Sequence, residues 1–168
     1  MADVALAIEE VVTLAEHEFK DNRINLTLEL EGGLPPIWAA EGQFHHIFMN
    51  LVRNAVQALS KARGDEPPER AGKSEIRIRA YPEAVNGKVA VEVADNGTGV
   101  PDDLKEKLFE PFFTTKRRGE GTGLGLYIVR QVVEDLGGSI SVGDSDLGGA
   151  SFTLRFPASR KGRSEMIG

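Results

Sequence analysis

The sequence contains no cysteine in its 168 residues, which excludes disulfide bonds and thiolate metal sites and fits a reducing compartment. No apolar run reaches the length of about 20 residues that a membrane-spanning helix requires, and the N-terminus lacks a signal-peptide pattern. The net charge of -6 offers no basic surface to nucleic acid. These absences predict a cytoplasmic chain that binds no nucleic acid and makes no membrane contact of its own.

The composition that remains is typical of a globular domain, with 40% hydrophobic and 27% charged residues. The length suits one folded unit with a sizeable core. We therefore expect a single domain over residues 1–157, followed by a disordered polar tail over 158–168. A charged, proline-containing stretch at 61–73 is expected to be a solvated loop.

Apolar periodicity predicts several helices. A first helix is capped by Asp3, and a long second helix covers 41–60. Pro101 opens a shorter helix. A further helix follows the glycines near residue 123 and ends at Gly137 and Gly138, which suit a left-handed C-terminal cap.

Strict alternation of apolar and polar residues predicts strands between these helices. The predicted strands cover 24–31, 37–40, 75–80, 88–94, 139–143 and 151–156. Asn86 and Gly87 form a hairpin-turn signal between two of them.

A glycine-rich segment, 119–138, passes directly into the last of these helices. Its glycines let the backbone approach a ligand closely, and the helix N-terminus presents unpaired N–H groups that suit a phosphate chain. Five apolar residues recur on one face of the helix: Ile128, Val129, Val132, Val133 and Leu136. The alternative is a plain linker before an ordinary helix.

Two asparagines, Asn50 and Asn54, lie one turn apart on the long helix and border its apolar face. Asparagine is a mediocre helix former, and a buried amide without partners is costly. The pair therefore favours a polar neighbour, such as a ligand, a hydrated cation or an adjacent strand. The alternative is that both amides cap backbone groups of a nearby loop.

Asp95 ends a predicted strand and begins the sequence DNGTGV. A carboxylate at a strand end can accept a hydrogen bond from a ligand amino group, and Gly97 and Gly99 leave room for a flat ring against the backbone. The same residues are also common in turns.

The segment 110–123, EPFFTTKRRGEGTG, has no clear periodicity. A long irregular segment in a compact domain is often a lid over a ligand, and cations beside glycines suit a polyphosphate. For Arg117 and Arg118 a solvated position is favoured.

Four of these segments together resemble the motifs of bacterial sensor histidine kinases. NLVRNA at 50–55, DNGTG at 95–99, LFEPFFTTK at 108–116 and GTGLGL at 121–126 look like the N box, first G box, F box and second G box, in the same order and at matching intervals. The resemblance covers nearly the whole chain and is strongest to the nitrogen-regulation and oxygen-sensing kinases.

The resemblance implies a two-layer α/β sandwich of the Bergerat type, with a mixed sheet covered by helices on one face. Heat-shock chaperone and mismatch-repair ATPases share this ATP-binding fold. ATP and Mg²⁺ are the implied cofactors. Asn54 would hold the Mg²⁺ with Asn50 in support, and Asp95 would accept from the adenine amino group with Gly97 and Gly99 beside the ring.

The resemblance also places residues around the phosphates. Thr115 and Lys116 would act from the lid, with Lys116 at the terminal phosphate, so that Asn50 and Lys116 are the implied catalytic residues. The backbone amides that would cradle the phosphates are those of Gly121, Thr122, Gly123, Leu124, Gly125 and Leu126.

One position distinguishes kinases from hydrolases within this superfamily. Hydrolysing relatives have a glutamate four residues before the Mg²⁺-binding asparagine, where it acts as general base for water. This chain has Asn50 there, and an amide does not take a proton at neutral pH. The prediction is therefore a kinase rather than an ATPase.

The chain departs from the family pattern at three places. It has three histidines, His17, His45 and His46, and none lies in a dimerising hairpin that would carry the phosphoacceptor; His46 is expected to be an ordinary packed histidine. Gln57 stands where many relatives have a cation for the phosphates. Ala150 stands where many have a threonine that binds adenine through water.

The predicted function is the ATP-binding catalytic domain of a sensor histidine kinase in two-component signal transduction, with the acceptor histidine outside this chain. The implied partners are the dimerisation domain of the same kinase and, indirectly, a response regulator receiver domain. The isolated domain is expected to be a monomer, cytoplasmic or the cytoplasmic part of a membrane-bound sensor. The alternatives are a free-standing serine kinase of the anti-sigma-factor type and a nucleotide-binding regulatory module without transfer activity.

Overall fold

The structure, a computed structural model, describes residues 1–40, 42–66, 72–85, 87–113 and 124–159. Its framework is a five-stranded sheet with the strand order β1-β2-β3-β5-β4. The strands are β1 (Ile24–Leu30), β2 (Ser74–Glu83), β3 (Lys88–Asp95), β4 (Ser139–Asp144) and β5 (Ala150–Pro157). Strand β1 runs parallel to β2, and every other pair is antiparallel, so the sheet is mixed, as predicted.

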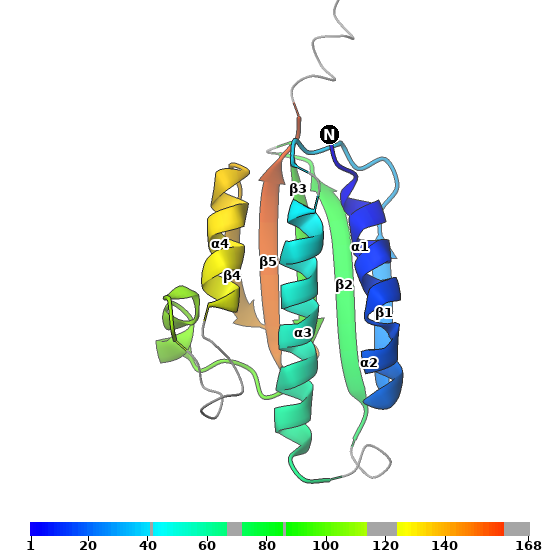
Figure 1. The fold of residues 1–168 in the computed structure, drawn as a ribbon, viewed down its shortest axis with the longest axis vertical. Helices are drawn as coiled ribbons and strands as arrows, with labels where there is room; N and C mark the ends of the chain where they lie inside the picture. Colours follow the sequence, from blue (N-terminus) through cyan, green and yellow to red (C-terminus); the bar gives the residue numbers. More distant parts are fainter. Residues whose placement is uncertain (41, 67–71, 86, 114–123, 160–168) are drawn as a thin grey trace, which may run out of the picture.

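The helices cover one face of this sheet (Figure 1). They are α1 (Val4–Leu14), α2 (Glu16–Asp21), α3 (Gln43–Arg63) and α4 (Gly125–Asp135). Helix α3 packs between α1 and α4 and contacts β3 beneath it. The expected two-layer α/β sandwich, with helices on one face of a mixed sheet, is confirmed.

The core lies between the two layers. Strand alternation sends one set of side chains toward the helices, and the largest fully buried residues come from both layers: Ile8, Ile37, Ile47, Phe48, Leu51, Ile76, Ile78, Leu154 and Phe156. Phe44 of α3 stacks on Phe48 and meets Phe156 edge-on, with ring centroids 5.8 and 5.3 Å apart. These contacts fix α3, which carries both asparagines, against β5.

The helix ends follow from local sequence. The Asp3 carboxylate accepts a hydrogen bond from the Leu6 amide at 3.1 Å and caps α1 as predicted. Helix α4 ends in a Schellman motif, in which the Gly137 amide donates to Glu134 O and the Gly138 amide to Val133 O, both at 2.9 Å. Gly137 has φ +78°, a conformation that glycine adopts without strain.

Several predicted boundaries are wrong. The first helix is two helices, because the chain leaves helical geometry at Ala15 before α2 begins. The predicted strand at 37–40 is only a single antiparallel bridge between Ala2 and Ile37. The helix expected after Pro101 is two short 3₁₀ turns, η1 (Asp102–Leu104) and η2 (Lys107–Phe109).

Other differences are smaller. Helix α3 extends to Arg63 rather than ending at residue 60. Ile128 of α4, grouped above with the apolar face of the helix, is 38% exposed. Asn86, from the predicted hairpin turn, and residues 67–71 of the predicted loop at 61–73 lie outside the described residues.

Strand β5 ends at Pro157, and the domain bounds 1–157 stay a prediction. The Ser159 amide still donates to Pro36 O at 2.9 Å. Residues 160–168 lie outside the described residues, so the disordered tail stays a prediction.

Candidate nucleotide-binding site

Asp95 is the one buried polar or charged residue in the described part of the chain, with 2% of its surface exposed. It lies at the end of β3, where the strand leaves the sheet under α3. Its Oδ1 accepts hydrogen bonds from the Gly97 amide at 2.8 Å and the Ala150 amide at 3.3 Å. No hydrogen bond from a described residue reaches Oδ2, so the second oxygen is available to an external donor.

Burial raises the pKa of the Asp95 carboxyl above its ordinary value, and the two amide hydrogen bonds oppose the rise without cancelling it. A carboxyl that is held in a buried position against this desolvation is a common feature of functional sites. The arrangement suits a ligand that brings its own hydrogen-bond donor to a partly dry site.

Three glycines lie near Asp95, two where a side chain would meet close neighbours and one with a positive φ. A Cβ on Gly97 would lie 2.9 Å from the carbonyl carbon and oxygen of Ala58 in α3, and a Cβ on Gly149 would lie 2.3 Å from Asp95 Oδ1. Gly99 has φ +71°. Helix α3 approaches this backbone closely because residue 97 has no side chain, while the space for a flat ring beside Gly97 and Gly99 stays a prediction.

The sequence did not predict Gly149 as a site residue. It singled out position 150 only because alanine stands there where many relatives have threonine. The Gly149 amide donates to Asp95 O at 3.1 Å, and the Ala150 amide reaches Asp95 Oδ1. Ala94 pairs with Ser151 in the β3–β5 register, which places Ala150 opposite Asp95. The available signal was the pair of glycines in the turn before the last predicted strand.

Asn54 and Asn50 both lie on α3, half-buried and one turn apart. The Asn50 amide nitrogen donates to His46 O at 2.7 Å and lies 3.5 Å from His46 Nε2. The Asn54 side chain makes no hydrogen bond with another described residue. Asn50 thus bonds back to the carbonyl one turn earlier in its own helix, and among the described residues neither asparagine caps a backbone group of a loop. His46 is exposed rather than packed.

The N-terminus of α4 lies against Asn50. A Cβ added to Gly125 would lie 3.3 Å from Asn50 Oδ1, so the helix can approach this asparagine because residue 125 is glycine. Leu124 is the N-cap residue, no described side chain caps the helix, and the first helical residues, Gly125 and Leu126, are half-buried. This geometry suits an anion at the helix end.

The 3₁₀ turn η2 is attached to the site by aromatic contacts. Phe109 is buried and meets Phe152 of β5 edge-on, with centroids 6.3 Å apart. The Arg130 guanidinium of α4 lies over the ring of Phe109, 5.5 Å from its centroid. Phe112, three residues further along, is 74% exposed and has φ +64°.

Part of the predicted site is not described. Thr115, Lys116, Gly121, Thr122 and Gly123 lie outside the described residues, as do Arg117 and Arg118. The predicted lid at 110–123 is therefore described only up to residue 113.

The donor set fits a Mg²⁺ ion held together with phosphates rather than by protein alone. Across the described ranges there is no group of three or more His, Cys, Asp or Glu side chains able to hold a metal. Asn54 offers an amide oxygen without a partner among the described side chains and backbone groups, and Mg²⁺ commonly takes one or two protein oxygens together with phosphate and water. None of the described helices is long and apolar enough to cross a membrane.

Comparison with protein families matches residues 39–160 to the family described as "Histidine kinase-, DNA gyrase B-, and HSP90-like ATPase". The chain is 40% identical over 140 residues to the sensor kinase CckA of Brucella abortus (strain 2308), covering 80% of this chain and 14% of the relative. It is 36% identical over 160 residues to the sensory histidine kinase/phosphatase NtrB of Rhizobium leguminosarum bv. phaseoli, covering 91% and 40%. The chain thus spans less than half the length of these curated relatives.

Solved structures share the fold. The nucleotide-free catalytic domain of the histidine kinase ThkA superposes with a TM-score of 0.74 at 32% identity, covering 91% of both chains. Full-length ShkA in complex with AMPPNP gives a TM-score of 0.74 at 30% identity, covering 93% of this chain and 30% of that one. ThkA in complex with the response regulator TrrA gives 0.72 at 27% identity, covering 94% and 41%. The chain belongs to the family of histidine kinase-, DNA gyrase B- and HSP90-like ATPases, and within it is a histidine kinase ATPase catalytic domain of the sensor-kinase type.

Proposed function

We propose that this domain binds Mg-ATP between α3, α4 and the end of β3, and delivers the γ-phosphoryl group to a histidine on the dimerisation domain of its parent kinase. The observation that carries the proposal is the buried Asp95 carboxylate, whose Oδ1 is taken by two backbone amides while Oδ2 is free of described partners. Adenine carries an amino group that can donate to Oδ2, whereas guanine presents a carbonyl oxygen at the equivalent place. The site should therefore prefer ATP to GTP.

Asn54 is the proposed Mg²⁺ ligand, because its side chain has no described hydrogen-bond partner and lies on the same helix face as Asn50. When bound, Mg²⁺ neutralises phosphate charge and orients ATP for transfer. The α4 N-terminus, with the amides of Gly125 and Leu126, is proposed to hold the phosphates. The same role is proposed, from the family resemblance, for Gly121, Thr122, Gly123 and Leu124, and phosphate contacts for Thr115 and Lys116.

Asn50 is proposed to position the phosphates and the metal rather than to activate water. Its amide nitrogen already donates to the His46 carbonyl, which turns Oδ1 toward the α4 N-terminus, where Gly125 leaves space. An amide has no basic site for a proton at neutral pH. Transfer to a histidine, which supplies its own nucleophile, is therefore favoured over hydrolysis.

Partners follow from the relatives rather than from this chain. ThkA is found in complex with a response regulator, and we propose that the parent kinase of this domain likewise passes phosphate from its histidine to a receiver domain in the cytoplasm. The domain alone is proposed to be monomeric. The sensor-kinase relatives favour histidine as the acceptor over the serine of the anti-sigma-factor type.

The test uses the purified chain with labelled ATP, with and without a separately produced dimerisation fragment of the parent kinase. The chain alone should stay unlabelled, and the fragment should gain acid-labile phosphate on histidine, slowly, because the two parts are no longer tethered. Calorimetry should show ATP binding that depends on Mg²⁺ and exceeds GTP binding. Phosphate on serine of a partner protein, or ATP binding without any transfer, would contradict the proposal.

A further inference from the structure

The turn between β4 and β5, residues 145–149, forms one wall around the Asp95 carboxylate. Its last residue donates from the Gly149 amide to Asp95 O at 3.1 Å, and the next amide, that of Ala150, reaches Asp95 Oδ1 at 3.3 Å. The position of this turn therefore decides which Asp95 oxygen is occupied and which is left for a ligand.

The turn is internally hydrogen-bonded. The Ser145 amide donates to Gly149 O at 2.8 Å, the Gly148 amide to Ser145 O at 3.0 Å, and the Leu147 amide to Ser145 Oγ at 3.0 Å. We expect a turn closed by these hydrogen bonds to move as a unit. A contact that fixes one of its residues should therefore also fix the position of Gly149.

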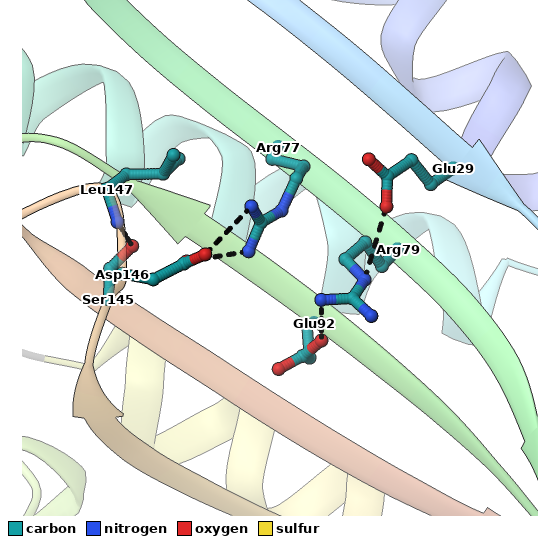
Figure 2. A network of polar contacts seen from close by, with 7 residues as sticks. All are labelled: Glu29, Arg77, Arg79, Glu92, Ser145, Asp146 and Leu147. Atoms are coloured by element: carbon teal, nitrogen blue, oxygen red, sulfur yellow. Dashed lines mark hydrogen bonds and ion pairs between the residues drawn. The ribbon is translucent and has the colours of Figure 1, made fainter.

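Asp146, in the middle of this turn, is bound by Arg77 of β2. The Arg77 Nη2 and Nη1 atoms donate to Asp146 Oδ1 and Oδ2 at 2.7 and 3.2 Å, a bidentate pair. Figure 2 shows the guanidinium reaching from β2 toward the turn. The pair raises the pKa of Arg77 and lowers the pKa of Asp146, so both groups keep their charge across ordinary pH.

The residues between Arg77 and the turn are small. Arg77 pairs with Ala94 of β3, and Ala94 pairs with Ser151 of β5. Alternation along β3 sends Val93 toward the helices and Ala94 to the opposite, helix-free face. Two small residues, Ala94 and Ser151, follow Arg77 in this register, and the Arg77 side chain, only 18% exposed, reaches over this face to the Asp146 carboxylate.

We infer that Arg77 and Asp146 are positioning residues for the nucleotide site: their bidentate contact fixes the turn 145–149 so that Gly149 and Ala150 occupy one side of Asp95 and leave Oδ2 to the ligand. Neither residue touches the ligand, and the effect passes through the backbone of the turn. This inference rests on the proposed function, in which Asp95 binds adenine.

A neighbouring ion pair provides a matched control. Arg79 lies two residues along β2 on the same face, with Nε 3.3 Å from Glu29 Oε2 and Nη1 3.5 Å from Glu92 Oε2. Figure 2 shows this second group beside the first, joined to strands β1 and β3 and not to the turn. Arg79→Met removes the same charge from the same strand without releasing the turn.

The experiment compares Arg77→Met, Asp146→Ala, the double variant and Arg79→Met. Amide hydrogen exchange of Gly149 and Ala150 is measured in the ligand-free protein, relative to Val91 in the middle of β3. Because Asp146 is 70% exposed at its side chain, Asp146→Ala tests the contact with little risk to folding. Dissociation constants for ATP and GTP are measured on the same proteins by calorimetry.

Both single variants should speed exchange at Gly149 and Ala150 while Val91 is unchanged, and should weaken ATP binding by about two- to fivefold, the range of a partly exposed ion pair. GTP binding should change less, so the preference for ATP narrows. The double variant should be no worse than Arg77→Met, since the two residues act through one contact. Arg79→Met should leave all of these values at wild-type levels.

Unchanged exchange at Gly149 and Ala150 in both single variants would overturn the inference, as would equal effects of Arg77→Met and Arg79→Met. The proposed function is tested separately by wild-type ATP binding and its loss in Asp95→Asn. If exchange rises as expected but neither the wild type nor Asp95→Asn distinguishes ATP from GTP, the turn is positioned by Arg77 and it is the adenine assignment that fails.

Discussion

The carboxylate of Asp95 and the amide of Ala150 lie 3.3 Å apart although 55 residues separate them in the chain. Asp95 ends β3 and Ala150 begins β5, so the pairing of these two antiparallel strands brings the donor to the acid. Desolvation of the acid is only partly offset by this donor and by the Gly97 amide. Burial at this position therefore disfavours the charged form of the Asp95 carboxyl relative to its neutral form.

Asp95→Asn should raise the free energy of unfolding at pH 7 while removing the preference for ATP. Burial raises the folded-state pKa of Asp95, so the folded protein binds this proton more tightly than the unfolded chain does. Wild-type stability therefore falls as pH rises through the interval between the two pKa values, and the loss is complete above the folded one. Asparagine keeps the shape and carries no charge, so the variant escapes this loss.

The measurement is urea unfolding of both proteins from pH 7 down to about pH 4. The stability gap should be largest at neutral pH and should narrow as the wild-type carboxyl takes up its proton. ATP affinity should fall by about tenfold or more, because the asparagine amide faces another donor. Asp103→Asn, on an exposed neighbouring carboxylate, is the control for net charge. A gap that widens toward low pH would contradict the linkage.

Asn54→Ala should weaken nucleotide binding in the presence of Mg²⁺ and leave folding intact. The Asn54 side chain has no hydrogen bond within the described residues, and alanine is the better helix former by about 0.5 kcal/mol, so the melting temperature should stay level or rise. ATP titrations with Mg²⁺ and with EDTA separate the two contributions. The Mg²⁺-dependent part should fall by about tenfold, and the metal-free part should change little.

Lys61→Ala is the control for Asn54→Ala, because Lys61 lies on the same helix, two turns further along, and is exposed. It should leave both titrations near wild type. A metal response that is equally weakened in the two variants would assign the effect to the helix surface in general. A lower melting temperature with normal Mg-ATP binding in Asn54→Ala would make the asparagine structural.

Gly149→Ala should lower both stability and ATP affinity. The added Cβ would stand 2.3 Å from Asp95 Oδ1 and 2.5 Å from the Gly97 nitrogen, so the turn and the carboxylate must separate, at a cost of about 1–3 kcal/mol in unfolding free energy. Gly143→Ala on β4, where a Cβ meets nothing within 4 Å, is the matched control and should be near neutral in urea unfolding. Equal effects of the two substitutions would show that the contact around Asp95 is not tight.

The sequence predicted the features that depend on neighbouring residues. Alternation located β3 and its terminal acid, and the glycines predicted the Schellman cap of α4. The wall formed by Gly149 and Ala150 was not predicted, because it depends on the register between β3 and β5, which local pattern does not specify. The break at Ala15 was missed for a related reason: both short helices keep one apolar face in phase, since Val11, Ala15 and Phe19 are all buried.

Three other errors have a different origin. Ile37 is apolar and buried, as a strand residue often is, but among the described residues its backbone pairs only with Ala2 at the start of the chain. Ile128 lies at the edge of the apolar face of α4, and no described element covers it completely. His46 was expected to pack because it shares the stripe of Asn50, whereas it lies exposed and contacts the Asn50 amide. The exposure of Ile128 and His46, and the single pairing of Ile37, depend on residues of other segments that the local sequence does not identify.

Asn50→Glu should convert part of the bound ATP to ADP, which the wild-type domain should do very slowly. Asn50 Oδ1 faces the N-terminus of α4 at Gly125, where the phosphates are proposed to lie, so a carboxylate at this position is placed to accept a proton from an attacking water. We expect a rise in phosphate release of about tenfold or more, measured at saturating Mg-ATP. Asn50→Gln is the matched control, because glutamine has the length of glutamate without its basicity, and both lose the short contact to His46 O. Hydrolysis that rises equally in the two variants would point to looser phosphate binding rather than to a base. If ATP affinity is retained in Asn50→Glu and hydrolysis stays at the wild-type rate, the side chain at position 50 does not reach the water, and the missing carboxylate is not what makes this domain a poor hydrolase.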